Sequence, residues 1–254
     1  MNVALDIAHV SKRFGGLLAV DDVTLQVSEG SLTALIGPNG AGKTTLFNAI
    51  TNLFPSSAGT IRFFGQDLAG LGGAAIARLG LVRTFQSARV FPGMTALENI
   101  LSGAHMHVRA RAPTQMLWLP AARREEASLT RKAEALLDLV GLAEFRDTAA
   151  TDLPMGAQKM LEVVRALMAR PRMLLLDEPA AGLNDSETAE LAALLMAIRA
   201  SAITIVVVEH NMSLVMGIAD QVAVLDAGRL VALGKPAEIQ RDQRVIEAYV
   251  GLET

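Results

Sequence analysis

The apolar residues of this chain follow two different patterns in its N-terminal part. In residues 5–10 and 23–27, apolar and polar positions alternate, which predicts strands of an antiparallel sheet with one exposed face. Residues 32–36 form a nearly continuous apolar run that ends at a glycine, as in a parallel strand that is buried on both faces. Residues 42–53 then show helical spacing. The pattern predicts an antiparallel β-subdomain followed by a β-α unit of a parallel sheet.

The pattern changes after two more short strands, which are expected at residues 60–65 and 79–86. Residues 95–108 and 123–142 have helical spacing, and the second segment carries charges on one face and Leu or Val on the other. Three apolar strands are expected later in the chain, at residues 173–178, 203–210 and 221–226. Helical segments separate these strands, and the tail fits one or two short helices. This pattern is typical of a βαβ core that is interrupted by a helical insert.

The insert divides the chain into two parts. We expect the helical subdomain at residues 87–165. The α/β core, with its antiparallel β-subdomain and the C-terminal tail, is expected at residues 1–86 and 166–254. A chain of 254 residues is long enough for one large α/β domain with an inserted subdomain.

Composition excludes several classes of protein. Apolar residues make up 51% of the chain, but no run reaches the roughly 18 clean apolar residues of a membrane span. The best candidate, residues 191–208, contains Arg199 and is interpreted as a helix followed by a buried strand. The net charge of −3 gives no case for nucleic-acid binding. The absence of cysteine rules out disulfides and thiolate zinc sites, and Asp6 and His9 interrupt the apolar run that a secretion signal needs.

Residues 37–45, GPNGAGKTT, fit the P-loop pattern G-x-x-x-x-G-K-[ST] between a predicted strand and a predicted helix. The glycines allow the backbone to turn its N–H groups toward phosphate, and the helix that begins near Gly42 adds the positive end of its dipole. Lys43 can reach the β- and γ-phosphates, and the Thr44 hydroxyl can bind Mg²⁺. The expected nucleotide contacts are Gly37, Pro38, Asn39, Gly40, Ala41, Gly42, Lys43, Thr44 and Thr45. We therefore predict a P-loop NTPase core that binds a nucleotide and Mg²⁺.

Two adjacent carboxylates supply the second half of the expected site. The apolar run at residues 173–176 leaves Asp177 at the carboxyl end of a buried strand, where open α/β sheets bind their ligands. Asp177 is expected to hold Mg²⁺, directly or through water. Glu178 is placed to polarise an attacking water molecule as a general base. The chain has no N-K-x-D guanine-reading motif, which disfavours a GTPase.

A further series of short motifs follows in a fixed order. Gln86 follows a strand at the start of the insert, and the sequence LPMGAQ stands near its end, at residues 153–158. The sequence AAGLND at residues 180–185 comes after Glu178, and His210 ends the strand ITIVVVEH. With the P-loop ahead of them, these motifs resemble those of the ATP-binding subunit of an ABC transporter. The resemblance runs from about residue 5 to the end of the chain.

The resemblance implies a role for each matching residue. Phe14 in SKRFGG corresponds to the aromatic residue that stacks on adenine. Gln86 corresponds to the residue that senses Mg²⁺ and the attacking water, and His210 to the residue that contacts the γ-phosphate. The family also implies that two chains pair head to tail, so that each ATP lies between one P-loop and the signature sequence of the other chain. The second ATP-binding subunit is then either a copy of this chain or a paralogue.

The signature sequence departs from the common form L-S-G-G-Q. Here Pro154 replaces the serine, and Gly156 is the residue expected to face the nucleotide of the partner chain. The helix dipole and the Gly156 N–H remain available to phosphate, and proline suits a first helical position. The next loop carries Asn184 followed by Asp185, where many family members have an aspartate directly after the leucine.

Longer phrases narrow the resemblance to one branch. The ATP-binding subunits of branched-chain amino acid importers have segments similar to three in this chain, which are RFGGLLAVDDVTL, RTFQSARVFPGMTALENI and VVVEHNMSLVMGIAD. The resemblance implies a peripheral protein at the cytoplasmic face of the membrane, with permease subunits as partners and a substrate-binding protein as an indirect partner. Related importers carry urea, short amides or aromatic acids, and the sequence does not choose among these solutes.

Two other functions remain open at this point. One is a soluble ABC-class ATPase, although those usually carry two cassettes in one chain. The other is a regulator that binds nucleotide but hydrolyses it weakly, which Pro154 and Asn184 would favour. We also expect the apolar segment SARVFPGM, residues 87–94, to help form the groove that receives a short cytoplasmic helix of the permease.

Overall fold

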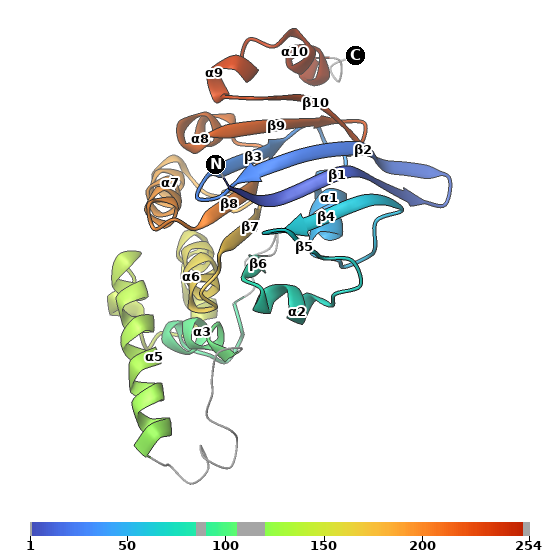
Figure 1. Cartoon of the computed structure of the whole chain (residues 1–254). Helices are drawn as coiled ribbons and strands as arrows, with labels where there is room; N and C mark the ends of the chain where they lie inside the picture. The colour runs from blue at the N-terminus through green and yellow to red at the C-terminus, as the bar shows by residue number, and fades with distance from the viewer. Residues whose placement is uncertain (1, 85–89, 106–119, 251–254) are drawn as a thin grey trace. The chain divides into compact units, whose positions relative to one another are not determined.

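The computed structural model describes residues 2–84, 90–105 and 120–250 (Figure 1). The chain forms two compact units, each built from more than one segment. The larger unit comprises Met1–Gln86, Arg172–Ala181 and Thr188–Thr254, and the smaller unit comprises Ser87–Pro171 and Gly182–Glu187.

The larger unit contains an antiparallel sheet near its N-terminus. Its strands are β1 (Val3–Phe14), β2 (Leu17–Ser28), β4 (Ala58–Phe63) and β5 (Gln66–Asp67), in the order β2-β1-β4-β5. In β2 the buried positions are Val20, Val23, Leu25 and Val27, while most of the residues between them are exposed or half-buried. This is the alternation expected of a sheet with one face toward the core.

The second sheet of the larger unit has six strands. Its strands are β3 (Leu32–Ile36), β6 (Leu81–Arg83), β7 (Met173–Asp177), β8 (Thr204–Val208), β9 (Gln221–Asp226) and β10 (Arg229–Gly234). The order is β10-β9-β3-β8-β7-β6, and only the pair β9–β10 is antiparallel among the described strands of this sheet. Every residue of β3, β7 and β8 is buried, as continuous apolar strands require.

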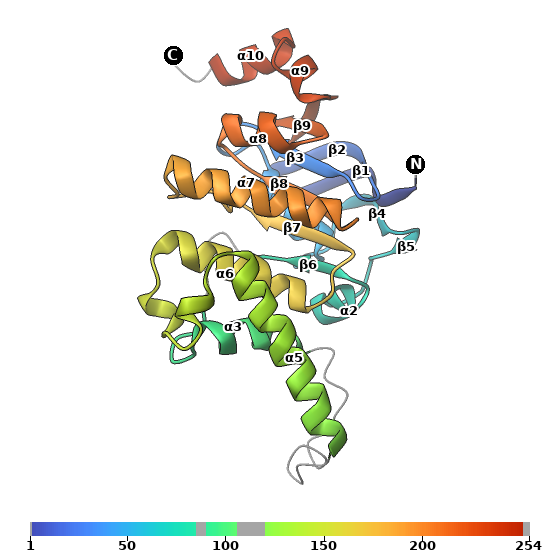
Figure 2. The same cartoon turned by 90° about the vertical axis from the view of Figure 1, so that its left-hand side faces the viewer.

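Helices cover both faces of the six-stranded sheet. Helix α1 (Lys43–Ile50) packs between this sheet and the antiparallel sheet, with Leu46, Phe47 and Ile50 in the shared core. Helices α7 (Asp185–Ala200) and α8 (Met212–Ile218) lie along the opposite face, in front of the strands in Figure 2. The short helix α2 (Gly73–Arg78) adds Ile76 to the core on the α1 side.

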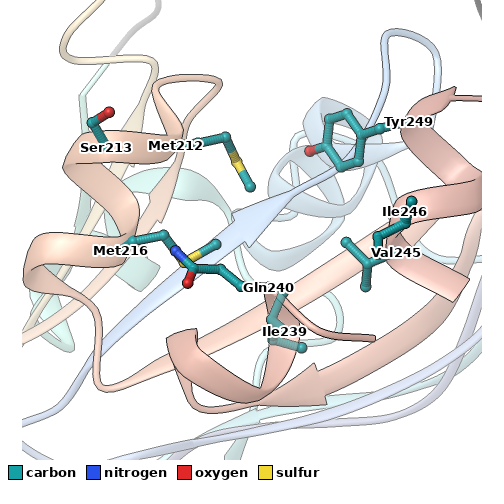
Figure 3. Close-up of a pocket in the computed structure, with 8 residues that line it drawn as sticks. All are labelled: Met212, Ser213, Met216, Ile239, Gln240, Val245, Ile246 and Tyr249. Carbon is teal, nitrogen blue, oxygen red and sulfur yellow. The ribbon is translucent and has the colours of Figure 1, made fainter. Parts of the chain in front are cut away.

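The C-terminal part of the larger unit borders an open pocket of about 450 Å³ (Figure 3). Side chains of α8, α9 (Pro236–Ile239) and α10 (Gln243–Val250) line it, and most of them are apolar. Tyr249 of α10 is one of these side chains, and its hydroxyl is buried without a hydrogen-bond partner among the described residues. Burial raises the pKa of the Tyr249 phenol, and the backbone of Gly37 offsets part of this rise.

The smaller unit is helical. It contains α3 (Ala96–Ser102), α5 (Pro120–Leu139), α6 (Met155–Met168) and the short 3₁₀ turns η2 (Ala143–Phe145) and η3 (Ala150–Asp152). Helix α3 packs against α5 and α6. Its first turn is closed by a capping box, in which Thr95 and Glu98 each accept a hydrogen bond from the backbone N–H of the other. Close approach to α6 requires Gly103, because a Cβ atom there would overlap the carbonyl oxygen of Arg165.

The apolar stretch at residues 191–208 divides as the sequence predicts. Helix α7 ends at Ala200, and β8 begins at Thr204. Across the described ranges, 2–84, 90–105 and 120–250, none of the helices combines the length and the apolar character that crossing a bilayer requires.

Candidate functional site

The carboxyl ends of the parallel strands border a cavity of about 510 Å³ in the larger unit. Residues 39–45 form one wall, and residues 17–19 and 227–228 form another. The side chains of Glu178 and His210 complete the lining. The glycine-rich loop, an acidic residue and a histidine from three separate segments therefore meet at one edge of the sheet.

The start of α1 is built to leave backbone N–H groups available. Gly42 precedes the helix with φ 98°, and no side chain in the described part of the molecule caps this end. A Cβ atom at Gly42 would overlap the carbonyl oxygen of Ala19, so both the conformation and the space require glycine. An uncapped helix start with no acidic residue in its first turn is a ready site for an anion.

Gly37 fixes the other end of the loop. Its φ of 147° lies in a region that favours glycine, and a Cβ atom there would overlap the carbonyl oxygen of Leu225 at the end of β9. The loop is tied to the rest of this edge by a bond from the Gly228 N–H to the Ala41 carbonyl, 3.0 Å. The phosphate loop is therefore held against β9 and the turn that follows it.

Lys43 lies folded onto the loop. It is 6% exposed, and its Nζ donates to the carbonyl oxygens of Gly37 at 2.7 Å and Pro38 at 2.9 Å. Burial lowers the pKa of Lys43, and the carboxylates of Glu178 and Asp177 oppose that effect. The ammonium group is a mobile donor, so it can exchange the two carbonyl oxygens for phosphate oxygens.

Asp177 is held by an arginine that the sequence analysis did not single out. Its Oδ2 pairs with Nη2 of Arg83 at 2.7 Å, and Arg83 Nη1 also donates to Asn48 Oδ1 in α1 at 2.6 Å. Asp177 is 1% exposed, and its Oδ1 has no hydrogen-bond partner among the described residues. A buried carboxylate oxygen with no partner fits a hard cation such as Mg²⁺.

Glu178 and His210 form a pair at the mouth of the cavity. His210 Nε2 and Glu178 Oε1 are 3.2 Å apart, and both side chains are partly exposed. Glu178 has φ 51°, a left-handed conformation that is costly for a non-glycine residue and that clusters at functional sites. Its N–H donates to the carbonyl oxygen of Val208 at 2.9 Å, which joins the end of β7 to the end of β8.

A second buried carboxylate stands beside this pair. Glu209 is 3% exposed, and its Oε1 accepts from the N–H of Ala180 at 2.7 Å. Its Oε2 accepts from the N–H groups of His210 at 3.0 Å and Asn211 at 3.3 Å. Its sequence position places Glu209 only in a predicted strand, because its partners are backbone groups that no motif reveals.

Two further residues were predicted from the sequence to contact the nucleotide and the metal, Phe14 at the adenine and Gln86 at Mg²⁺. Phe14 is 45% exposed at the end of β1, with its ring edge-on to Phe54 at 5.1 Å between centroids, and it does not line the cavity. Leu17 lines the cavity instead and is 66% exposed. Gln86 lies outside the described residues.

The signature sequence begins α6 in the smaller unit. Pro154 occupies the N-cap position, one residue before the first helical position that its ring geometry suits. Gly156 is buried, and a Cβ atom there would overlap the carboxyl group of Glu187. Glu187 also accepts from the N–H of Asn184 at 2.9 Å, and Asn184 Oδ1 accepts from the Glu187 N–H at 3.0 Å. Asn184 therefore closes a capping box at the start of α7, a role that aspartate would also fill.

Comparison with protein families gives two matches. The family described as ABC transporter matches residues 20–181, and the family described as branched-chain amino acid ATP-binding cassette transporter matches residues 229–253. The second match covers β10, α9 and α10. The chain thus resembles this group in both its nucleotide-binding part and its tail.

Curated relatives of this chain have similar lengths. It is 44% identical over 248 residues to the high-affinity branched-chain amino acid transport ATP-binding protein BraF of Pseudomonas aeruginosa, with 97% of each chain covered. It is 42% identical over 248 residues to the corresponding protein LivG of Escherichia coli K12, again with 97% of each covered. Both alignments include the P-loop and the signature sequence, because they span almost the whole chain.

Solved structures show the same fold. An ATP-binding cassette of an ABC transporter in its ADP conformation superimposes with a TM-score of 0.85 at 30% identity, covering 99% of this chain and 100% of that one. A nucleotide-free ATP-binding cassette gives a TM-score of 0.82 at 30% identity, with 97% and 98% covered. The predicted fold class, an α/β core with an antiparallel β-subdomain, is confirmed.

Proposed function

Because this chain belongs to the ABC transporter family, as the ATP-binding subunit of a branched-chain amino acid importer, we propose roles for its own residues in the ATP hydrolysis that drives transport. One observation carries the proposal. The uncapped start of α1, Lys43, Glu178 and His210 all border the same cavity. A phosphate cradle, a cation and a base supply the main needs of terminal-phosphate hydrolysis, and an imidazole can donate a hydrogen bond to the γ-phosphate.

Binding of the nucleotide is the task of the loop. The backbone N–H groups of residues 39–45 receive the phosphate oxygens, and the dipole of α1 stabilises their charge. Lys43 leaves the carbonyl oxygens of Gly37 and Pro38 and binds the β- and γ-phosphates. Phe14 stacks on the adenine of the nucleotide after a local movement, since its ring packs against Phe54 in the present conformation.

The metal would be held by two side chains and the nucleotide. The Thr44 hydroxyl is exposed in the cavity lining, and the Oδ1 atom of Asp177 is the buried oxygen without a partner in the described residues. Gln86 is proposed as a third contact, on its motif alone. Mg²⁺ bound there would neutralise charge on the phosphate oxygens.

Glu178 is the proposed general base. It takes a proton from the water molecule that attacks the γ-phosphorus, and the bond from that phosphorus to the β,γ-bridging oxygen breaks, so the products are ADP and inorganic phosphate. His210 donates a hydrogen bond to a γ-phosphate oxygen. The separation of 3.2 Å between Nε2 and Oε1 keeps the imidazole within reach of the base.

A second ATP-binding subunit completes the site. Gly156 and the dipole of α6 face the γ-phosphate that is bound by the partner chain, so that each ATP is sandwiched between two subunits. The support is chemical: α6 has no side-chain cap within the described residues and no acidic residue in its first turn. The partner is either a second copy of this chain or a paralogue.

The membrane partner is proposed to dock on the exposed loop before α3. Phe91 is 47% exposed and Met94 is 40% exposed, and Pro92 and Gly93 between them are exposed as well. Asn99 holds the loop in place, with its Oδ1 accepting from the Phe91 N–H at 2.7 Å. Residues 87–89 of the predicted docking segment lie outside the described residues. This contact would keep the chain at the cytoplasmic face of the membrane as a peripheral subunit.

The proposal is tested with the assembled transporter in lipid vesicles. ATP hydrolysis should rise when a substrate-binding protein loaded with leucine, isoleucine or valine is added. The same protein loaded with urea or an aromatic acid serves as the specificity control. No ATP turnover with any loaded binding protein would favour a nucleotide-binding regulator. Stimulation only by urea or an aromatic acid would reject the branched-chain substrate.

A further inference from the structure

Glu209 carries a buried charge next to the proposed catalytic pair. A carboxylate that is 3% exposed is costly unless its oxygens are satisfied, and here both of them are. We propose that Glu209 is a positioning residue that fixes Glu178 and His210 relative to each other by bridging the two loops that carry them.

The bridge has two ends. Oε1 of Glu209 accepts from the N–H of Ala180, two residues after Glu178, at 2.7 Å. Oε2 accepts from the N–H of His210 at 3.0 Å and from the N–H of Asn211 at 3.3 Å. One side chain thus binds the backbone after β7 and the backbone after β8.

A carboxylate suits this position better than an amide. All three of these partners are backbone N–H groups, which are donors only, and an ionised carboxylate is an acceptor at both oxygens. A glutamine can accept through one oxygen, while its NH₂ group would face a backbone N–H on the other side. The conservative substitution Glu209→Gln therefore breaks one end of the bridge and keeps the size of the side chain.

The bridge reinforces a strained loop. Glu178 has φ 51°, and its own N–H is bound to the carbonyl oxygen of Val208 at 2.9 Å. That bond and the bond from Ala180 to Glu209 are consecutive links between the same two loops. Without the second link, the peptide after Glu178 can relax from its strained conformation, and the carboxylate of the base then moves away from His210.

The phosphate loop lies outside this bridge. None of these three bonds of Glu209 reaches residues 37–45, so ATP binding by the P-loop should not depend on it. The inference rests on the proposed roles of Glu178 and His210, because a positioning residue acts only through the groups that it positions. It predicts that loss of the Glu209 bridge lowers kcat and leaves the affinity for ATP nearly unchanged.

We would measure Glu209→Gln in the assembled transporter and in the isolated chain. The expected result is a fall in kcat of about 10–100-fold, the cost of misplacing a catalytic group by about an ångström. The Kd of the isolated chain for ATP should stay within about threefold. Glu209→Asp is a second variant, which keeps the charge but is too short to span both loops, and it should also lower kcat. If either variant folds and keeps the kcat of the wild type, the proposal is overturned.

Asp220→Asn is the matched control. Asp220 also bridges backbone and side chain, since its Oδ2 accepts from the Leu32 N–H at 2.9 Å and its Oδ1 pairs with Arg199 at 2.9 Å. It stands at the amino ends of the parallel strands, the opposite edge of the same sheet. Asp220→Asn should lower the thermal stability and leave kcat within about twofold. Equal losses of kcat in Asp220→Asn and Glu209→Gln would mean that Glu209 acts only on general stability, and would reject the proposal.

A double-mutant cycle separates this inference from the assignment of the base. In a Glu178→Gln background the positioned group is already gone, so Glu209→Gln should cause little further loss of the residual rate. A further loss as large as in the wild-type background would reject positioning through Glu178. If Glu178→Gln alone left turnover near normal, the proposed function would fail instead, and the two failures are distinguished by that single variant.

Discussion

Two glycine-containing helix starts of this chain, those of α1 and α6, look alike locally and differ in their surroundings. Within the described residues, neither has a side-chain cap, and neither has an acidic residue in its first turn. Each therefore offers unpaired backbone N–H groups and the positive end of a helix dipole to an anion. By local structure alone, either could bind phosphate.

Their neighbours separate them. The start of α1 opens onto a cavity that also receives Lys43, Glu178 and His210. Beside the start of α6, the space next to Gly156 is filled by the carboxyl group of Glu187. A cation beside one helix start favours a bound anion, whereas a carboxylate beside the other disfavours one.

The difference shows that an uncapped helix start is only part of a phosphate site. The larger unit holds a cradle, a cation and a base together, and so can bind ATP by itself. In the proposed function, the smaller unit would offer its helix start to a phosphate that another subunit supplies and neutralises. Substitutions at the two sites should therefore fail in different ways.

The largest effect is expected at the base. Glu178→Gln keeps the phosphate cradle and removes the group that takes the proton from water, so kcat should fall by about two to four orders of magnitude. ATP binding should persist, and the variant should accumulate as an ATP-bound dimer. Gel filtration with ATP and a steady-state ATPase assay measure both. Near-normal turnover would show that another group is the base.

The variant Lys43→Ala should weaken the binding of ATP itself. It removes the one side-chain cation aimed at the β- and γ-phosphates, whose charge-assisted hydrogen bonds are worth about 1.5–3 kcal/mol. The Kd of the isolated chain for ATP should rise about 10–100-fold. Lys159 is also a buried lysine, but in α6, and Lys159→Ala is the control for loss of a buried lysine elsewhere. If Lys43→Ala bound ATP normally, the self-sufficient site at α1 would be in doubt.

The variant Pro154→Ser tests how much the missing serine hydroxyl matters at the start of α6. A serine hydroxyl could add one hydrogen bond to phosphate, but replacing proline also loosens the entry into α6. We expect the ATPase rate of the assembled transporter to change by less than about tenfold in either direction. A hundredfold gain would mean that the natural signature is impaired, and it would favour a regulatory function.

The smallest effect is expected at Tyr249 in α10. It is the single tyrosine of the chain, and burial raises its pKa above the usual value. The protonated phenol is favoured in the folded state, so this contribution to stability is present below a pH of about 10, the usual tyrosine pKa, and is lost as the pH rises through the folded-state pKa. Unfolding midpoints measured across this range should fall more for the wild type than for Tyr249→Phe. Parallel curves for the two proteins would contradict this.

The sequence predicted the larger unit well because its signals are local. A buried strand, a glycine loop and a helix follow each other directly at the P-loop, and the apolar runs at β3, β7 and β8 have no alternation that would suggest an exposed face. The split of residues 191–208 into α7 and β8 follows from the change to β-branched residues. The elements α2, β5 and β10 were missed because they are short or alternate weakly, although β5 and β10 each pair with the strand directly before them.

The supporting residues could not be predicted because their partners lie far away in the sequence. Arg83 contacts Asp177 across 94 positions of sequence, and Glu209 binds a backbone N–H 29 positions away. Neither belongs to a motif that the sequence analysis used. Residues 17–19 were not predicted to line the cavity, because their place there depends on the fold and not on a side-chain motif.

The assignment of the two helix starts to different nucleotides is tested most directly by the variant Gly156→Asp. It is measured in the assembled transporter and in the isolated chain. In the assembled transporter, the added carboxylate would meet Glu187 and repel phosphate, so ATP turnover should fall at least about a hundredfold. In the isolated chain, the Kd for ATP should stay within about threefold of the wild-type value, because the α1 site is complete without it. Turnover within tenfold of wild type, or a loss of ATP binding by a folded isolated chain, would contradict the assignment of the two helix starts to two different nucleotides.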